Sequence, residues 1–209
     1  IENEEVYASW LQPFDPESVG TRGYPRYWWY LRSLFTDASH ENHQAGLEVA
    51  RTLWSEAPLR ARIGLAFAFP GEASWAREAA EACLARDEMP QGAHFLVAVL
   101  DDGELVEKLV RAIPGAAKLL EPLLTYRMVK NLGPAAVGVL EALLFVEDDS
   151  RFSDHRLEHA KALALIQSES SALAFSKLFE DWNTKVVARA KSFLNTNGAH
   201  LLTALSKDA

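Results

Sequence analysis

The amino-acid sequence predicts an all-α protein, built as an α-solenoid in which antiparallel helix pairs form a right-handed superhelix. Apolar residues recur at helical spacing along nearly the whole chain, whereas no stretch alternates convincingly in the way a strand does. Helix-starting residues are frequent, and Pro58, Pro90, Pro114 and Pro134 each stand just ahead of an apolar run. The helix pairs that result repeat about every 30–40 residues, a period typical of solenoids.

The first 40 residues differ from the rest of the chain. An acidic stretch contains Glu2, Glu4 and Glu5 and is followed, after a loop rich in Pro and Gly, by the aromatic segment Tyr24–Phe35. Terminal units of a solenoid are atypical because they must close off the core. We therefore predict a single domain over residues 1–209, in which residues 1–40 form an acidic and aromatic cap and residues 41–209 form the repeats.

From residue 41 onward the sequence predicts successive pairs of amphipathic helices of about 10–16 residues each, joined by short turns that oblige neighbours to lie antiparallel. The apolar run Gly64–Phe69 predicts a buried helix segment, and Gly133 predicts a left-handed helix end. Ser153, Ser168 and Asn183 stand where N-caps are expected. The predicted pairs span Gln44–Phe69, Glu72–Leu100, Glu104–Leu132, Ala135–Gln167 and Glu169–Thr196.

The predicted core consists of the large apolar residues on the inward faces of these helices. They are Leu53, Trp54, Ile63, Phe67, Trp75, Leu96, Leu100, Leu109, Leu120, Leu140, Leu163, Ile166, Phe175, Leu178, Phe193 and Leu202.

Composition narrows the class of protein. The 209 residues are 49% hydrophobic and carry a formal net charge of -8, which argues against a general binder of nucleic acid or anionic membranes. No apolar run approaches the roughly 18–20 residues of a membrane span. The single cysteine, Cys83, cannot form an intramolecular disulfide and is expected in the core. We predict a cytoplasmic protein with no membrane partner.

The chain begins at Ile1, without Met and without the basic segment of a signal peptide. This beginning leads us to expect that the chain was trimmed, or was excised from a longer protein.

A family resemblance rests on several apolar helical segments. They are Ala57–Pro70 followed by Trp75-Ala76, then Leu132–Ala136, Ala160–Ile166, and Ala188–Leu194 running into Ala199–Leu202. Together they resemble the HEAT-like repeat region of large bacterial proteins that often carry a WGR domain, some of which are called molybdate metabolism regulators. The resemblance covers roughly residues 45–209. It implies a HEAT-like α-solenoid that acts as an interaction scaffold, although the Trp-Gly-Arg tripeptide is absent from this chain.

The sequence therefore predicts a non-catalytic protein-interaction scaffold, the repeat region of a larger bacterial regulator-like protein. Its expected partner is another protein or an adjoining domain of the longer parent chain. The chain holds no G-x-S-x-G elbow, no G-x-x-x-x-G-K-[ST] phosphate loop and no G-x-G-x-x-G fingerprint. We expect no enzymatic activity and no cofactor.

One alternative is a zinc-dependent hydrolase. His155, Glu158 and His159 match the H-x-x-E-H pattern, in which two histidines on one helix face hold zinc and the glutamate acts as general base. Peptidases with this pattern have mixed α/β scaffolds, and this chain supplies no strands. The competing interpretation is that both histidines border the packed face of their helix.

A second alternative is a DNA-binding protein of the HEAT-like glycosylase type, which presents a basic concave face. Residues 151–209 carry a small excess of basic groups, and Lys185 and Arg189 are spaced to meet a phosphate or a carboxylate of a partner. The acidic balance of the whole chain opposes nucleic acid.

The aromatic segment Tyr24–Phe35 offers a candidate partner-binding site. Trp29 lies largely outside the apolar stripe of this predicted helix, with Arg26 and Arg32 three residues to either side. Trp and Arg are enriched in binding hot spots. The competing interpretation is that the arginines stack on Trp29, or that the acidic stretch before it covers all three.

Overall fold

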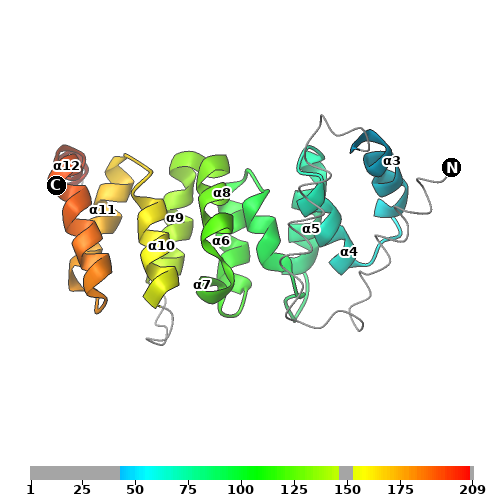
Figure 1. The fold of residues 1–209 in the computed structure, drawn as a ribbon, viewed down its shortest axis with the longest axis horizontal. Coiled ribbons are helices and arrows are strands. Elements are labelled where there is room, and N and C mark those ends of the chain that lie inside the picture. The colour runs from blue at the N-terminus through cyan, green and yellow to red at the C-terminus, as the bar shows by residue number, and fades with distance from the viewer. Residues whose placement is uncertain (1–42, 146–152, 208–209) are drawn as a thin grey trace. The chain divides into compact units, whose positions relative to one another are not determined.

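The computed structural model of this chain describes residues 43–145 and 153–207 (Figure 1). Every regular element in these residues is a helix and none is a β-strand, which confirms the all-α prediction. None of the described helices is long and apolar enough to cross a membrane. The cap predicted for residues 1–40 lies outside the described residues and stays a prediction.

Backbone contacts divide the chain into two compact units, one ending at Val99 and the other beginning at Leu100. Each unit has buried apolar residues of its own. The prediction that residues 1–209 form a single domain stays a prediction.

The described part of the first unit is built around one buried helix. Its elements are α3 (His43–Trp54), α4 (Leu59–Ala68), α5 (Ala73–Leu84) and the 3-10 helix η2 (Ala93–Ala98). Helix α4 contacts the other three, and its residues from Ile63 onward are buried on all sides. Pro58 precedes the helix in an extended conformation, where its missing N–H costs nothing. The buried segment predicted at Gly64–Phe69 is confirmed.

Aromatic rings join the helices of the first unit. Trp54 at the end of α3 stacks on Trp75 of α5, with 4.4 Å between ring centroids and planes 4° apart. Phe69 meets the same Trp75 edge-on, and Phe67 packs against Phe95 of η2. These rings bury large apolar areas in favoured geometries and therefore link α3, α4, α5 and η2.

One predicted core residue is wrongly placed. Leu53 is 39% exposed. Successive residues of a helix point about 100° apart, and in the last turn of α3 the inward direction belongs to Trp54, which stacks on Trp75. Trp54 itself is half-buried. The structure does not describe the side chain of Leu202, and the other predicted core residues are all buried.

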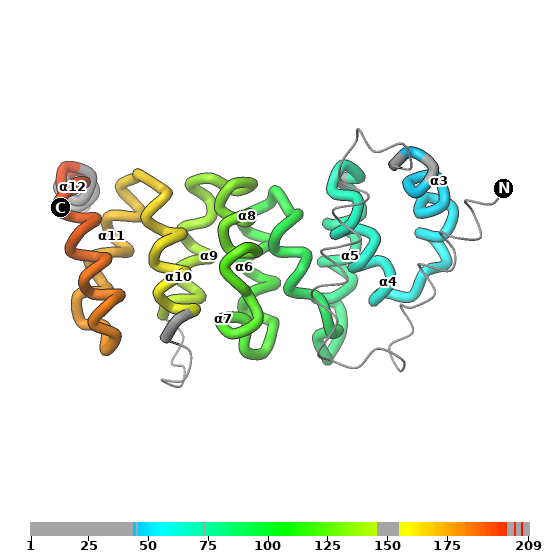
Figure 2. The backbone as a smooth tube through the Cα atoms, in the orientation of Figure 1, coloured from blue at the N-terminus to red at the C-terminus, as the bar shows by residue number. Residues whose placement is uncertain are grey.

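The second unit contains the remaining described helices. They are α6 (Gly103–Ala112), α7 (Ala116–Leu119), α8 (Pro122–Leu132), the 3-10 helix η3 (Gly133–Ala135), α9 (Ala136–Leu144), α10 (Ser153–Leu163), α11 (Glu169–Lys177), the 3-10 helix η5 (Leu178–Glu180) and α12 (Thr184–Lys207). Between α6 and α8 the backbone reverses through the single turn of α7 (Figure 2).

The longer helices of the second unit lie in two rows. Helix α9 contacts α6 on one side and α11 on the other, and these three form the first row. Helix α10 likewise contacts α8 and α12, and these three form the second row. The rows are joined most extensively by α11 with α12 and by α9 with α10. Each predicted pair from Glu104 onward thus places one helix in each row.

Several predicted helix ends are confirmed. The Ser168 hydroxyl accepts a hydrogen bond from the Ser171 N–H in a reciprocal capping box at the start of α11. The Asn183 side-chain oxygen accepts from the Lys185 N–H at the start of α12. Gly133 ends α8 at the predicted place with a positive φ of 55°, which favours glycine, but its ψ of -128° lies outside the left-handed helical region predicted for it. Ser153 is the first residue of α10, and its capping role stays a prediction.

Two predicted helices are shorter than expected. After Pro90 the chain forms only η2, and after Pro114 it forms only the single turn of α7. In both places a glycine follows the proline within two residues, and Gly92 and Gly115 adopt positive φ values of 90° and 67°. A residue with positive φ cannot continue a right-handed helix, so neither proline starts one and each element begins only after its glycine.

Candidate functional site

The first candidate site from the sequence lies outside the described residues. Arg26, Trp29 and Arg32, predicted to contact a partner, fall within residues 1–42, and the contact-site hypothesis stays a prediction.

The second candidate, the H-x-x-E-H pattern, lies on α10. His159 is buried between α10, α7 and α8, and its Nε2 is 3.2 Å from the backbone oxygen of Ala117. Its Nδ1 is 3.2 Å from the hydroxyl oxygen of Thr125. Burial lowers the pKa of His159 to about 4, so the ring is neutral at physiological pH.

The partners of His159 fix its tautomer. A carbonyl oxygen only accepts, so Nε2 must carry the proton that is donated to Ala117. In a neutral ring Nδ1 is then the acceptor, and its lone pair points at the Thr125 hydroxyl. A metal ion shared with His155 would need a nitrogen lone pair that the ring already uses inside the core.

The other two members of the pattern are placed differently. His155, one turn before His159, is half-buried, and its Nδ1 is buried without a hydrogen-bond partner in the described residues. The Glu158 carboxylate accepts hydrogen bonds from the Tyr126 hydroxyl at 3.3 Å and from Lys161 Nζ at 2.6 Å. No three His, Cys, Asp or Glu side chains of the described residues are grouped to hold a metal.

Arg156, which follows His155 on α10, also has a structural contact. Arg156 forms an ion pair with Asp181, with 2.9 Å between Nε and a carboxylate oxygen. The arginine side chain is 16% exposed and that of Asp181 only 1%. This pair ties α10 to the turn that precedes α12.

A patch of polar residues crosses the second row. We call Tyr126 of α8, Glu158 and Lys161 of α10, and Arg189 of α12 the second-row polar patch. Burial and the Glu158 carboxylate raise the pKa of Tyr126, and the hydrogen bond to Glu158 raises that of Lys161. The positive charge of Arg189 acts against both shifts. Within the described residues, the buried Nε of Arg189 has no hydrogen-bond partner.

Sequence reasoning found only part of this patch. It identified Lys185 and Arg189 as a pair one helical turn apart, but not the groups that surround Arg189. Tyr126 and Arg189 are far apart in the sequence, and the helices that carry them are brought together only because α10 packs against both α8 and α12. No local pattern signals such a contact.

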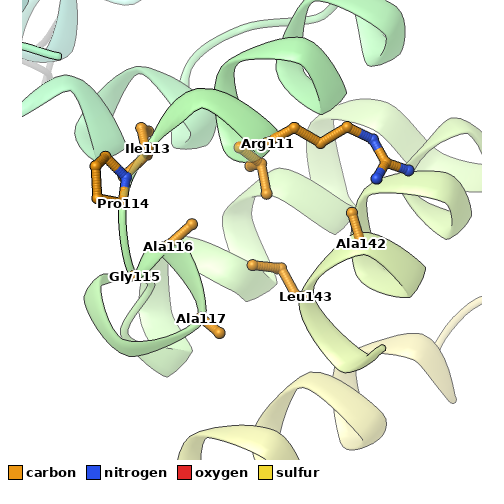
Figure 3. A pocket seen from close by; sticks show the side chains of 9 residues that line it. Arg111, Ile113, Pro114, Gly115, Ala116, Ala117, Ala142 and Leu143 are labelled. Atoms are coloured by element: carbon orange, nitrogen blue, oxygen red, sulfur yellow. The ribbon is translucent and has the colours of Figure 1, made fainter. Parts of the chain in front are cut away.

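A pocket of about 380 Å³ lies elsewhere in the second unit, where α6 and α7 meet α9. Ile113, Pro114 and Ala116 line one side and Leu143 points toward them from α9, while the guanidinium of Arg111 extends away (Figure 3). That guanidinium pairs with Glu107 at 2.7 Å. The lining side chains other than that of Arg111 are apolar, so the pocket suits an apolar side chain.

These contacts join helices of the second unit to one another, which is a structural role. No protein-family model, no curated protein and no solved structure matches this chain.

Proposed function

We propose that this chain is a non-catalytic scaffold for protein–protein interaction. In this proposal it is a right-handed α-solenoid of HEAT-like helix pairs, within a larger, cytoplasmic, bacterial regulator-like protein. The resemblance to WGR-associated repeat regions belongs to the same proposal.

Support for the solenoid comes from the two rows of the second unit. In stacked repeats each helix pair contacts only its neighbours, first helix against first and second against second. The first row (α6, α9, α11) and the second row (α8, α10, α12) have this order of contacts. Such stacking leaves one side of each row available to a partner, as in other repeat proteins that bind through extended surfaces.

The observation that carries the proposal is the second-row polar patch. It combines a tyrosine, a lysine and an arginine from three adjacent helices with no more than partial burial. Tyr and Arg are residue types that dominate interface energetics. The same groups include no Ser, Thr or Cys nucleophile with an adjacent base, the arrangement that covalent catalysis uses most often.

The test uses the full chain as bait in three forms. They are the wild type, a patch variant with Lys161→Glu and Arg189→Glu, and a control with Arg86→Glu and Lys191→Glu, which makes the same charge change at exposed positions. Partners are identified by mass spectrometry and verified with purified proteins. We expect at least one partner that binds the wild type and the control but not the patch variant. A set of captured proteins that is identical for all three baits would contradict the proposal.

The zinc-hydrolase alternative gains no support from the geometry, because both ring nitrogens of His159 form hydrogen bonds within the core. Metal analysis of the purified chain separates the two functions. Stoichiometric zinc that disappears in a His155→Ala/His159→Ala variant would favour the hydrolase over the scaffold.

A further inference from the structure

Arg189 is the least satisfied charged group of the second-row polar patch. Its Nε is buried without a hydrogen-bond partner, and no ion pair joins its guanidinium to a carboxylate of the described residues. Guanidinium stays charged at any physiological pH and offers five N–H donors. Buried donors in native proteins almost always have an acceptor. The Nε of Arg189 is enclosed, so it is the terminal N–H groups of this half-buried side chain that remain available to an acceptor from another molecule.

The immediate surroundings of Arg189 carry an excess of positive charge. Lys161 forms its ion pair with Glu158, and that single carboxylate must also accept the hydrogen bond of Tyr126. Arg189 therefore adds a charge that this carboxylate does not neutralise. Lys185 lies one helical turn before Arg189 on α12 and is exposed, which extends the positive surface along the same helix face.

The donors of the patch match a carboxylate. A guanidinium binds a carboxylate through two parallel hydrogen bonds, and the ammonium of Lys161, which has three N–H donors, adds further donors to the same anion. We infer that Lys161 and Arg189, beside Tyr126, form a binding site for an Asp or Glu side chain within an acidic segment of a partner protein, with Lys185 contacting a second carboxylate. This inference rests on the proposed scaffold function and names the chemistry of its partner.

A nucleic acid fits the same surface less well. The formal net charge of the chain is -8, so its overall field repels a polyanion that extends beyond the patch. Binding to a nucleic-acid backbone requires several cations along the phosphates, whereas the patch presents one unmatched guanidinium with Lys185 beside it. A short acidic peptide segment needs only the local excess of positive charge around Arg189 and Lys185.

The test measures binding of defined probes to the full chain at low ionic strength by calorimetry. The probes are acetylated hexaglutamate, acetylated hexalysine, and an oligothymidylate with the same number of negative charges as hexaglutamate. We expect hexaglutamate to bind most tightly, and Arg189→Gln to weaken its binding about tenfold, as expected for loss of a charge-assisted hydrogen-bonded pair. The matched control, Lys191→Gln, removes the same charge from an exposed position of α12 and should bind like the wild type.

Each other outcome overturns the inference. Equal weakening by Arg189→Gln and Lys191→Gln would mean a diffuse charge effect, and tighter binding of oligothymidylate would assign the site to nucleic acid. Absence of hexaglutamate binding to the wild type would also reject it. Lys185→Gln serves as a second variant if Arg189→Gln unfolds. Because Lys185 is exposed, its substitution should weaken hexaglutamate binding without changing the stability of the protein. A partner that is captured by the full chain but unaffected by Arg189→Gln would leave the scaffold function standing and reject only the acidic segment.

Discussion

The imidazole of His159 donates a hydrogen bond to the backbone oxygen of Ala117, with 3.2 Å between Nε2 and that oxygen, and so joins α10 to α7. Through Nδ1 the same ring accepts from Thr125 of α8. A histidine that the sequence places in a zinc-binding pattern is therefore a neutral link between three helices of the second unit.

Stability should depend on pH through His159. Burial lowers the pKa of the folded group from an ordinary 6.5 to about 4, so between these values the unfolded chain binds a proton that the folded chain does not. The free energy of unfolding should fall by roughly 3 kcal/mol as pH falls through this window and should lose nothing more from this group below it. Urea unfolding at several pH values, compared between wild type and His159→Gln, measures how much of the pH dependence of the free energy of unfolding comes from His159. Burial lowers the pKa of His94 in the same way, so His94→Gln is the matched control and should leave the His159 share in place.

Removal of Arg156 should destabilise the second unit. Arg156→Met leaves the Asp181 carboxylate buried without its cation, and such broken pairs cost about 3–5 kcal/mol. Lys108→Met breaks an exposed ion pair with Glu104 on α6 and should leave the free energy of unfolding almost unchanged. Equal effects of the two variants in chemical denaturation would show that the Arg156 pair is no stronger than an exposed one.

A methyl group at Gly103 should also destabilise the protein. A Cβ there would lie 2.9 Å from the Cβ of Ala135 and 3.3 Å from its backbone oxygen, and neither atom belongs to a flexible chain end. We expect Gly103→Ala to cost about 1–3 kcal/mol. Gly138→Ala is the control, because its Cβ would meet only the end of the Glu107 side chain, which can shift together with its exposed partner Arg111. Since alanine is the better helix former, Gly138→Ala should be neutral or stabilising by up to about 1 kcal/mol.

Cys83 should be unreactive in the native protein. Burial raises the pKa of its thiol to about 11, so the thiolate that attacks disulfide reagents is scarce at about pH 8. Ellman's reagent should react slowly with the folded chain and should release one equivalent of chromophore after denaturation. Rapid stoichiometric reaction without denaturant would show that α5 opens readily.

Local signals predicted local structure well. The capping box of Ser168 and Ser171, the positive φ of Gly133 and the buried run Gly64–Phe69 all depend on residues within one or two helical turns. The prediction for Leu53 was wrong because helical spacing defines the apolar stripe of a helix only approximately. It does not say which of the adjacent residues Leu53 and Trp54 packs against an aromatic ring of another helix. That choice depends on Trp75, which lies on another helix.

The candidate site was predictable only in part. The sequence shows His155 and His159 on one helix face, but the contacts that fix the role of His159 come from Ala117 and Thr125 in other helices. The surroundings of Arg189 likewise depend on helix neighbours that no spacing along the chain specifies. Trp29, predicted as a contact residue, lies outside the described residues, and its role remains a hypothesis.

The stack of Trp54 on Trp75 gives the first unit an optical signature of its own. Two indoles held nearly parallel at 4.4 Å couple electronically, and their near-ultraviolet circular dichroism should vanish when α3 separates from α5. The second unit has its own chromophore in Trp182, which is 52% exposed and emits from a largely aqueous setting. Difference spectra between wild type and Trp75→Phe or Trp182→Phe would therefore follow each unit separately during unfolding, without any added dye.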